Sequence, residues 1–146
     1  MIRVLKVFFA AVLLAYVLAS TLATQSNLGN LQMLGMQVGF GDWAATTAHD
    51  LVGMASSYLP LIAGAFAIGL PVAAGLTRRL PRHRALLYAL AGFTAVVALH
   101  LIMRAALGLT PVAATRTTAG LIGQGAAGAL GGLGYHWLTR PLAKSA

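Results

Sequence analysis

Four long apolar stretches, separated by polar connections, organise the chain. They cover about residues 4–24, 51–77, 85–109 and 117–138. Each holds roughly 20 residues or more, the length at which a helix rising about 1.5 Å per residue crosses a hydrocarbon core of about 30 Å. None shows the short alternating pattern of a membrane-spanning strand. The pattern predicts an all-α integral membrane protein, with four transmembrane helices in one compact bundle and a single domain over residues 1–146.

The basic residues between these stretches predict the orientation. Only Arg104 and Arg116 fall on one side of the membrane, and every other Lys and Arg falls on the opposite side: Arg3, Lys6, Arg78, Arg79, Arg82, Arg84, Arg140 and Lys144. Cytoplasmic connections of membrane proteins are enriched in Lys and Arg. Both termini are therefore expected in the cytoplasm.

The N-terminal stretch has one alternative interpretation. A basic start, an apolar run and the sequence Val17-x-Ala19 resemble a signal peptide with its cleavage site. The apolar character continues through Leu22 and Ala23, further than in a usual signal peptide. A membrane span is favoured, and cleavage would leave three spans.

The only long connection, residues 25–50, is expected outside the cytoplasm. Its apolar residues are too many for a freely solvated loop, and its glycines at positions 29, 35, 39 and 41 argue against one continuous helix. We expect it to lie along the membrane surface or to fold back over the bundle, with Trp43 at the interface. A short helix is expected to begin near Asp42 and to run into the second span.

Composition excludes a soluble domain. Hydrophobic residues make up 59% of the chain and charged residues 8%, whereas a soluble domain averages about 25% charged. The net charge of +8 would suggest nucleic acid in a soluble protein, but here the basic residues are scattered over short segments beside the membrane. We therefore expect no nucleic-acid partner. The expected location is a bacterial cytoplasmic (inner) membrane. The chain contains no cysteine, which excludes disulfides and thiolate-bound metals.

Small residues predict glycine-rich helix packing, because they let helix backbones approach closely inside a bilayer. The alternative is that one small-residue face forms a homo-oligomer or binds a partner. The second stretch also contains Pro60 and Pro71, which tend to kink a helix. The small residues singled out in the second and fourth stretches are Ala65, Gly69, Gly123, Ala127, Gly128, Gly131 and Gly132.

The third stretch contains the sequence HLIMR, with His100 and Arg104 one helical turn apart. At about 100° per residue, both lie opposite a stripe of alanines that begins at Ala91. Arg104 is expected to pair with Asp50 or Asp42. The polar residues expected near the outer helix ends are His49, Asp42, Asp50, Tyr58, His100, Arg104, Arg116 and Gln124. They predict a structural clasp, meaning ion pairs and hydrogen bonds that fix the outer loop onto the bundle. The alternative is an outward-facing pocket for an anionic or amphipathic ligand.

Other kinds of chemistry find little support. Of the four histidines, only His49 and His100 share the outer half, at different depths, so neither haem nor another metal is expected. No nucleotide-binding loop or catalytic triad is present, so no catalytic residue and no cofactor are predicted. The connection RRLPRHR carries Arg78, Arg79, Arg82 and Arg84. These arginines could bind anionic lipid headgroups, although setting the topology is their more ordinary role.

These features favour a small non-enzymatic membrane protein, an accessory or scaffold subunit of a membrane complex. Its partners would be membrane lipids and either another membrane protein or further copies of itself. One alternative is a small oligomeric transporter or channel whose path is lined by His100, Arg104 and Asp50. A second alternative is a respiratory subunit that binds quinone or haem.

Overall fold

The computed structural model describes residues 2–108 and 110–140, and these residues form helices joined by short connections. The all-α prediction is confirmed within them. Leu109, the expected end of the third span, and Lys144 lie outside the described residues. The elements are α1 (Ile2–Met33), α2 (Phe40–Gly53), α3 (Tyr58–Arg79), η1 (Pro81–His83), α4 (Arg84–Leu107), η2 (Ala113–Arg116) and α5 (Thr118–Leu138).

Three helical segments are long and apolar enough to cross a membrane: Ile2–Met33, Tyr58–Arg79 and Pro81–Leu107. They are compatible with an integral membrane protein. The fourth predicted span is a helix, α5, over almost the expected residues, but it is not among the three. Glycine adds little hydropathy, and Gln124 and His136 lower it, so the mean hydropathy of α5 stays below that of the three candidate spans. The crossing of the membrane by α5 stays a prediction.

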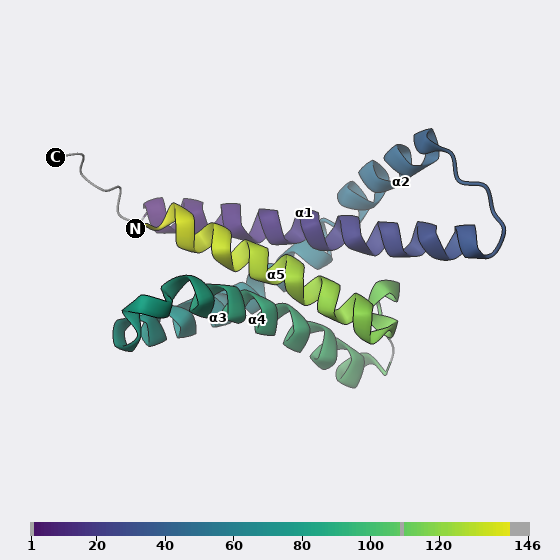
Figure 1. Ribbon diagram of the computed structural model, residues 1–146. Helices are drawn as coiled ribbons and strands as arrows, with labels where there is room; N and C mark the ends of the chain where they lie inside the picture. The colour runs from purple at the N-terminus through teal and green to yellow at the C-terminus, as the bar shows by residue number, and fades with distance from the viewer. Residues whose placement is uncertain (1, 109, 141–146) are drawn as a thin grey trace.

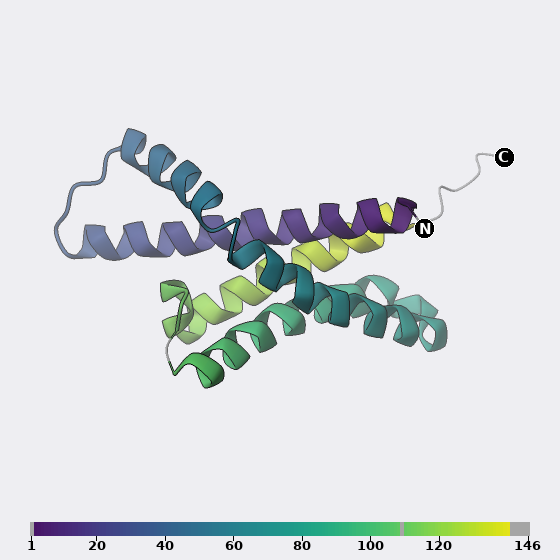
Figure 2. The same cartoon turned by 180° about the vertical axis from the view of Figure 1, so that it is seen from behind.

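The long helices lie side by side, with α5 between α1 and α4 (Figure 1). Helix α3 packs against α4 and against α1, as the reverse view shows (Figure 2). The start of α1, the η1 connection and the end of α5 share one end of the molecule. The turn after α1 and the η2 segment lie at the other end. The two ends therefore differ in charge, since the first carries every described basic residue except Arg104 and Arg116.

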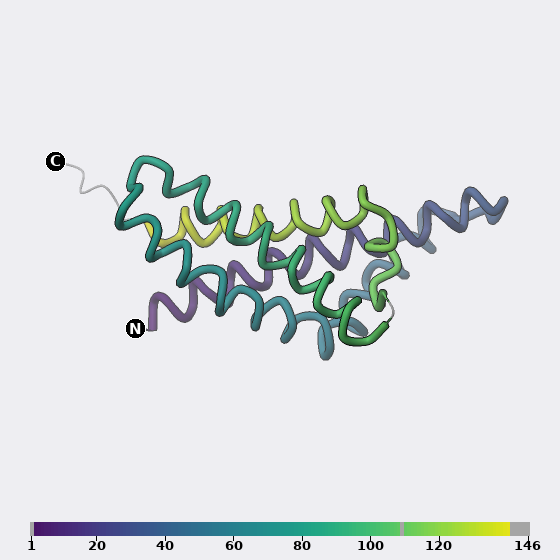
Figure 3. The backbone as a smooth tube through the Cα atoms, turned by 90° about the horizontal axis from the view of Figure 1, so that it is seen from below, coloured from purple at the N-terminus to yellow at the C-terminus, as the bar shows by residue number. Residues whose placement is uncertain are grey.

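Helix α1 is longer than the sequence pattern predicted. It does not stop near residue 24 but continues for 32 residues to Met33, a length of about 48 Å at 1.5 Å per residue. Its last turns project beyond the other long helices (Figure 3). The helix ends at Met33, and two residues later Gly35 has a φ of 84°, the left-handed conformation typical of a glycine that follows a helix end. The amides of Gly35 and Met36 donate to the carbonyls of Gln32 and Leu31 and close the helix end.

The expected surface loop is therefore mostly helix. Helix α2 begins at Phe40, close to the predicted start, and the Asp42 carboxylate accepts a hydrogen bond from the amide of Gly39. The second span was predicted from residue 51, which is wrong at that end, because α2 continues to Gly53 and residues 54–57 form a turn. Pro60 consequently lies in the first turn of α3, where its missing amide costs no helical hydrogen bond.

Helices α4 and α5 approach each other through glycine. A Cβ atom on Gly128 would overlap the carbonyl oxygen of Gly92, and one on Gly132 would overlap that of Tyr88. On the neighbouring side of α5, a Cβ atom on Gly131 would lie 2.7 Å from the Cβ of Ala15 in α1. These glycines face other helices of the same chain, so they leave no free face of α5 at those positions.

Candidate functional sites

A chain of buried hydrogen bonds joins the four long helices at one level. The Gln124 side chain on α5 donates from Nε2 to the carbonyl oxygen of Ala19 on α1, at 2.9 Å. The Tyr58 hydroxyl on α3 donates to Oε1 of Gln124 at 3.0 Å and lies 2.9 Å from Nε2 of His100 on α4. All three side chains are buried. The structure thus brings together three predicted site residues, Tyr58, His100 and Gln124.

Only one assignment of donors and acceptors fits this series of hydrogen bonds. Ala19 offers a carbonyl, so the amide nitrogen of Gln124 must face it and the amide oxygen must face Tyr58. The single hydroxyl proton of Tyr58 is then committed to Gln124. His100 must donate its own proton from Nε2 to the tyrosine oxygen. The polar groups that form these bonds satisfy one another, as buried polar groups in proteins generally do.

Asp50 is held by a polar stripe on α1. The residues Tyr16, Ser20 and Thr24 recur at every fourth position and are all buried. The Thr24 hydroxyl donates to the Asp50 carboxylate at 2.8 Å, and Ser20 lies 3.6 Å from the sulfur of Met54. Tyr16 donates to the carbonyl oxygen of Leu51. The stripe therefore fixes the end of α2 and the following turn onto α1. The sequence analysis missed it, although its four-residue spacing was visible.

The expected pairing of Arg104 with an aspartate is not formed. Asp50 bonds to Thr24 and Asp42 bonds to its own helix start, while Arg104 is exposed in the last turn of α4. It lines a polar pocket of about 230 Å³ together with Gly108, Thr110 and Arg116. The prediction failed because a helical pattern gives the depth of an arginine but not the distance to an acid on another element.

The remaining predicted polar residues stay apart from one another. His49 is exposed on α2, whereas His100 is buried and bonded to Tyr58. The exposed arginines Arg78, Arg79 and Arg82 lie around η1. Within residues 2–108 and 110–140, no three His, Asp or Glu side chains lie close enough together to hold a metal ion.

A second buried histidine was not among the predicted site residues. His136 on α5 accepts a hydrogen bond at Nε2 from Nε of Arg140, at 3.0 Å. Its Nδ1 is buried and has no hydrogen-bond partner among the described residues. Nearby, Arg84 donates to the Thr139 hydroxyl at 3.0 Å and stacks over the ring of Tyr88 at 5.6 Å. These contacts join the start of α4 to the end of α5.

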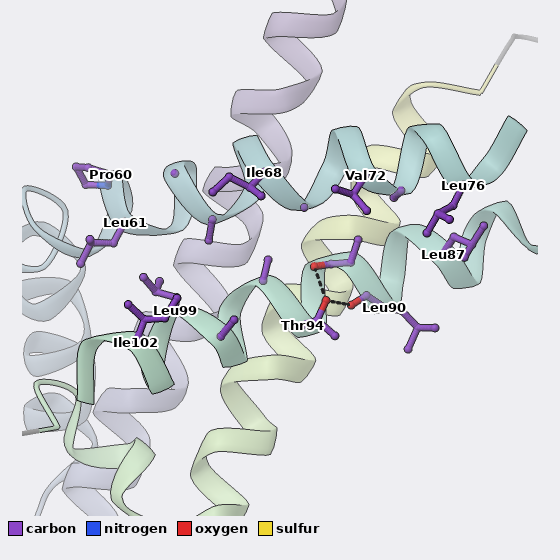
Figure 4. A pocket seen from close by; sticks show the side chains of 17 residues that line it. Pro60, Leu61, Ile68, Val72, Leu76, Leu87, Leu90, Thr94, Leu99 and Ile102 are labelled. Carbon is purple, nitrogen blue, oxygen red and sulfur yellow. Dashed lines mark hydrogen bonds between the residues drawn. The ribbon is translucent and has the colours of Figure 1, made fainter. Parts of the chain in front are cut away.

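An apolar groove with a volume of about 730 Å³ lies between α3 and α4. We call it the α3–α4 groove (Figure 4). Small residues such as Gly64, Ala65 and Gly69 from α3 lie among larger aliphatic side chains from both helices. The one hydroxyl in the lining, that of Thr94, bonds back to the carbonyls of Leu90 and Ala91 at 2.8 and 3.3 Å. The groove therefore offers shape and apolar surface rather than reactive groups.

Neither cavity is lined by Tyr58, His100 or Gln124. The buried hydrogen-bonded side chains of Tyr58, His100 and Gln124 therefore lie apart from both the α3–α4 groove and the polar pocket beside Arg104. No protein-family model matches the chain, and comparison with curated proteins and with solved structures finds no similar protein.

Proposed function

We propose that this protein is a non-enzymatic accessory subunit of a membrane complex, and that it holds a transmembrane helix of another protein in the α3–α4 groove. The observation that carries the proposal is the groove itself: a large apolar cavity with small residues in its lining and its single hydroxyl already bonded. Small residues let a second backbone approach closely, and close approach drives helix association in lipid.

The dimensions of the groove suit a helix. It runs along α3 from Pro60 to Leu76, a length of about 24 Å at 1.5 Å per residue, which is most of a hydrocarbon core of about 30 Å. Gly64 faces open space in this groove, since a Cβ atom there would have no neighbour within 4 Å. Gly128 and Gly132, which the sequence also suggested for partner binding, already pack against the backbone of α4.

Charge specifies the partner further. The groove ends beside the exposed Arg78, Arg79 and Arg82. A matching partner is an apolar helix that carries carboxylates just beyond its end on that side, where they would lie near these arginines. The same arginines would attract anionic lipid when no partner is present.

The proposal includes a topology. We infer four membrane-crossing helices in a bundle, with both termini in the cytoplasm of a bacterial inner membrane. The distribution of charge supports this, because the end with η1 and the start of α1 carries most of the basic residues. Helix α5 would cross beside α1 and α4, with its polar side chains Gln124 and His136 buried and with apolar side chains such as Leu130 exposed.

Filling the groove tests the proposal. The full chain, tagged and expressed in its native membrane, is purified in mild detergent as Gly64→Leu and Ala98→Leu variants. Both substitutions put a leucine into the groove. A stoichiometric membrane partner should co-purify with the unmodified protein and should be lost from both variants. Ala67→Leu is the matched control, because Ala67 is exposed on α3 but does not line the groove.

Crosslinking then identifies the occupant. A photoreactive phenylalanine at Ile68 in the groove should crosslink to an apolar helix of the partner with acidic residues beyond its cytoplasmic end. The same group at Ile122, exposed on α5 outside the groove, should not. Crosslinks at Ile68 only to lipid or to a second copy of this chain would contradict the proposal, as would full retention of the partner by both leucine variants.

A further inference from the structure

Arg104 and Arg116 are the two arginines separated from all other described basic residues, and the structure puts them around one pocket. Arg104 lies in the last turn of α4 and Arg116 at the end of η2. The polar pocket that they share with Thr110 and Gly108 has a volume of about 230 Å³, compared with about 30 Å³ per water molecule in the liquid. No carboxylate lines this pocket. Two positive charges therefore converge without a compensating acid.

The pocket has unused hydrogen-bond donors. The Arg116 Nε donates to the Thr110 hydroxyl oxygen at 3.3 Å, which leaves the terminal guanidinium nitrogens of Arg116 and the hydroxyl proton of Thr110 free of any bond among the described residues. Arg104 makes no side-chain hydrogen bond within residues 2–108 and 110–140. Guanidinium groups bind phosphate oxygens through paired, charge-assisted hydrogen bonds.

The backbone fixes the position of the pocket. Helix α4 ends at Gly108, whose φ of 65° is left-handed and whose amide donates to the carbonyl oxygen of Arg104. Gly108 thus turns the chain so that Thr110 and Arg116 come back beside Arg104. Helix α4 has 24 residues, about 36 Å at 1.5 Å per residue. A helix of this length that crosses the membrane is longer than a hydrocarbon core of about 30 Å, so its last turn would reach the headgroup layer that holds the lipid phosphates.

We propose that Arg104, Arg116 and Thr110 form a binding site for a phosphate group at the non-cytoplasmic end of the bundle. The phosphate accepts hydrogen bonds from both guanidinium groups and from the Thr110 hydroxyl, and it neutralises the two converging charges. The site is separate from the α3–α4 groove, so it does not depend on the proposed partner. A phospholipid headgroup and free phosphate present the same chemistry, and the two sources are separated by experiment.

The test uses the full chain in neutral detergent. Binding of short-chain phosphatidylglycerol is titrated by native mass spectrometry for the unmodified protein and for the double variant Arg104→Gln/Arg116→Gln. The double variant should bind at least about tenfold more weakly, since a factor of ten is less than one charge-assisted hydrogen bond contributes. Arg3→Gln/Lys6→Gln is the matched control, which removes the same charge from exposed positions at the other end and should change the affinity less than about twofold. Thermal unfolding of each variant reports whether the fold is retained.

Competition with inorganic phosphate identifies the source. If millimolar phosphate displaces the lipid from the unmodified protein, the site takes free phosphate. If it does not, the site takes the lipid headgroup. Either result supports the site, provided that the double variant has lost binding. Equal losses in the double variant and in its control would overturn the proposal, because binding would then follow overall charge. Unchanged binding by a folded double variant would also overturn it.

Discussion

Gln124 is the residue through which four helices exchange hydrogen bonds. It is fully buried, and it bonds directly to Ala19 of α1 and to Tyr58 of α3, which in turn bonds to His100 of α4. Methionine has a similar volume but can neither donate to the Ala19 carbonyl nor accept from Tyr58 as an amide does. The buried groups around it would lose their partners.

We therefore predict that Gln124→Met lowers the free energy of unfolding by about 1–3 kcal/mol, the cost of unsatisfied buried polar groups. Equilibrium unfolding in mixed micelles measures it. Gln32→Met, at an exposed position near the end of α1, is the control and should have little effect. Equal effects of the two substitutions would mean that the buried amide contributes nothing specific.

The direction of the hydrogen bonds makes a second prediction. Because Tyr58 donates to Gln124, neutral His100 must carry its proton on Nε2. Nitrogen-15 NMR of histidine-labelled protein in micelles should show a protonated Nε2 and an unprotonated Nδ1 for this residue. Gln124→Met frees the tyrosine proton and should let the other tautomer appear. A protonated Nδ1 in the unmodified protein would show that His100 does not donate to the Tyr58 hydroxyl and that the assigned donors are wrong.

At the scale of elements, the glycines of α5 are not equivalent. Those that face α4 allow backbone contact, whereas a Cβ atom on Gly123 would have no neighbour within 4 Å. The same single carbon atom should therefore have opposite effects at two positions in one helix.

Gly132→Ala should destabilise the protein by about 1–3 kcal/mol or more, because its Cβ would overlap the Tyr88 carbonyl and force the helices apart. Gly123→Ala should be neutral or should stabilise the helix by up to about 1 kcal/mol. Unfolding in micelles compares the two variants directly. Similar losses at both positions would show that α5 does not approach α4 at Gly132 as closely as described.

The sequence predicts the elements better than their contacts. Hydrophobic periodicity locates α4, α5 and the end of α3 to within a few residues. It predicts the start of α3 too early, because α2 ends at Gly53 and a turn separates the two helices. The predicted end of α1 is wrong, because the glycines from position 29 onward were expected to interrupt the helix, whereas Gly29 lies within α1 and Gly35 is the one of them with a positive φ. The buried histidine His136 and the bond from Thr24 to Asp50 depend on distances between elements. The pattern of a single sequence carries little information on such distances.

At the scale of the whole molecule, the absence of cysteine from the sequence makes the topology directly testable. Single cysteines placed at exposed positions of the connections can be labelled in intact cells with a reagent that does not cross the membrane. Met36→Cys and Pro111→Cys should be labelled from outside. His83→Cys and Arg140→Cys should be labelled only after the cells are opened. Labelling of Pro111→Cys and Arg140→Cys from the same side would mean that α5 does not cross and that three spans remain.

The position of α5 between α1 and α4 has a consequence for biosynthesis. Of the helices that the structure describes, α5 is the last in chain order, yet it is the one that packs against both α1 and α4. Until the ribosome has delivered it, α1 is held to α3 by a small contact area, and Tyr58 lacks its amide acceptor. Before α5 is made, α3 and α4 can already pack against each other, whereas α1 lacks most of its contacts with the rest of the bundle. A nascent chain that stops before Thr118 would expose the inner surfaces of three helices to membrane proteases and chaperones.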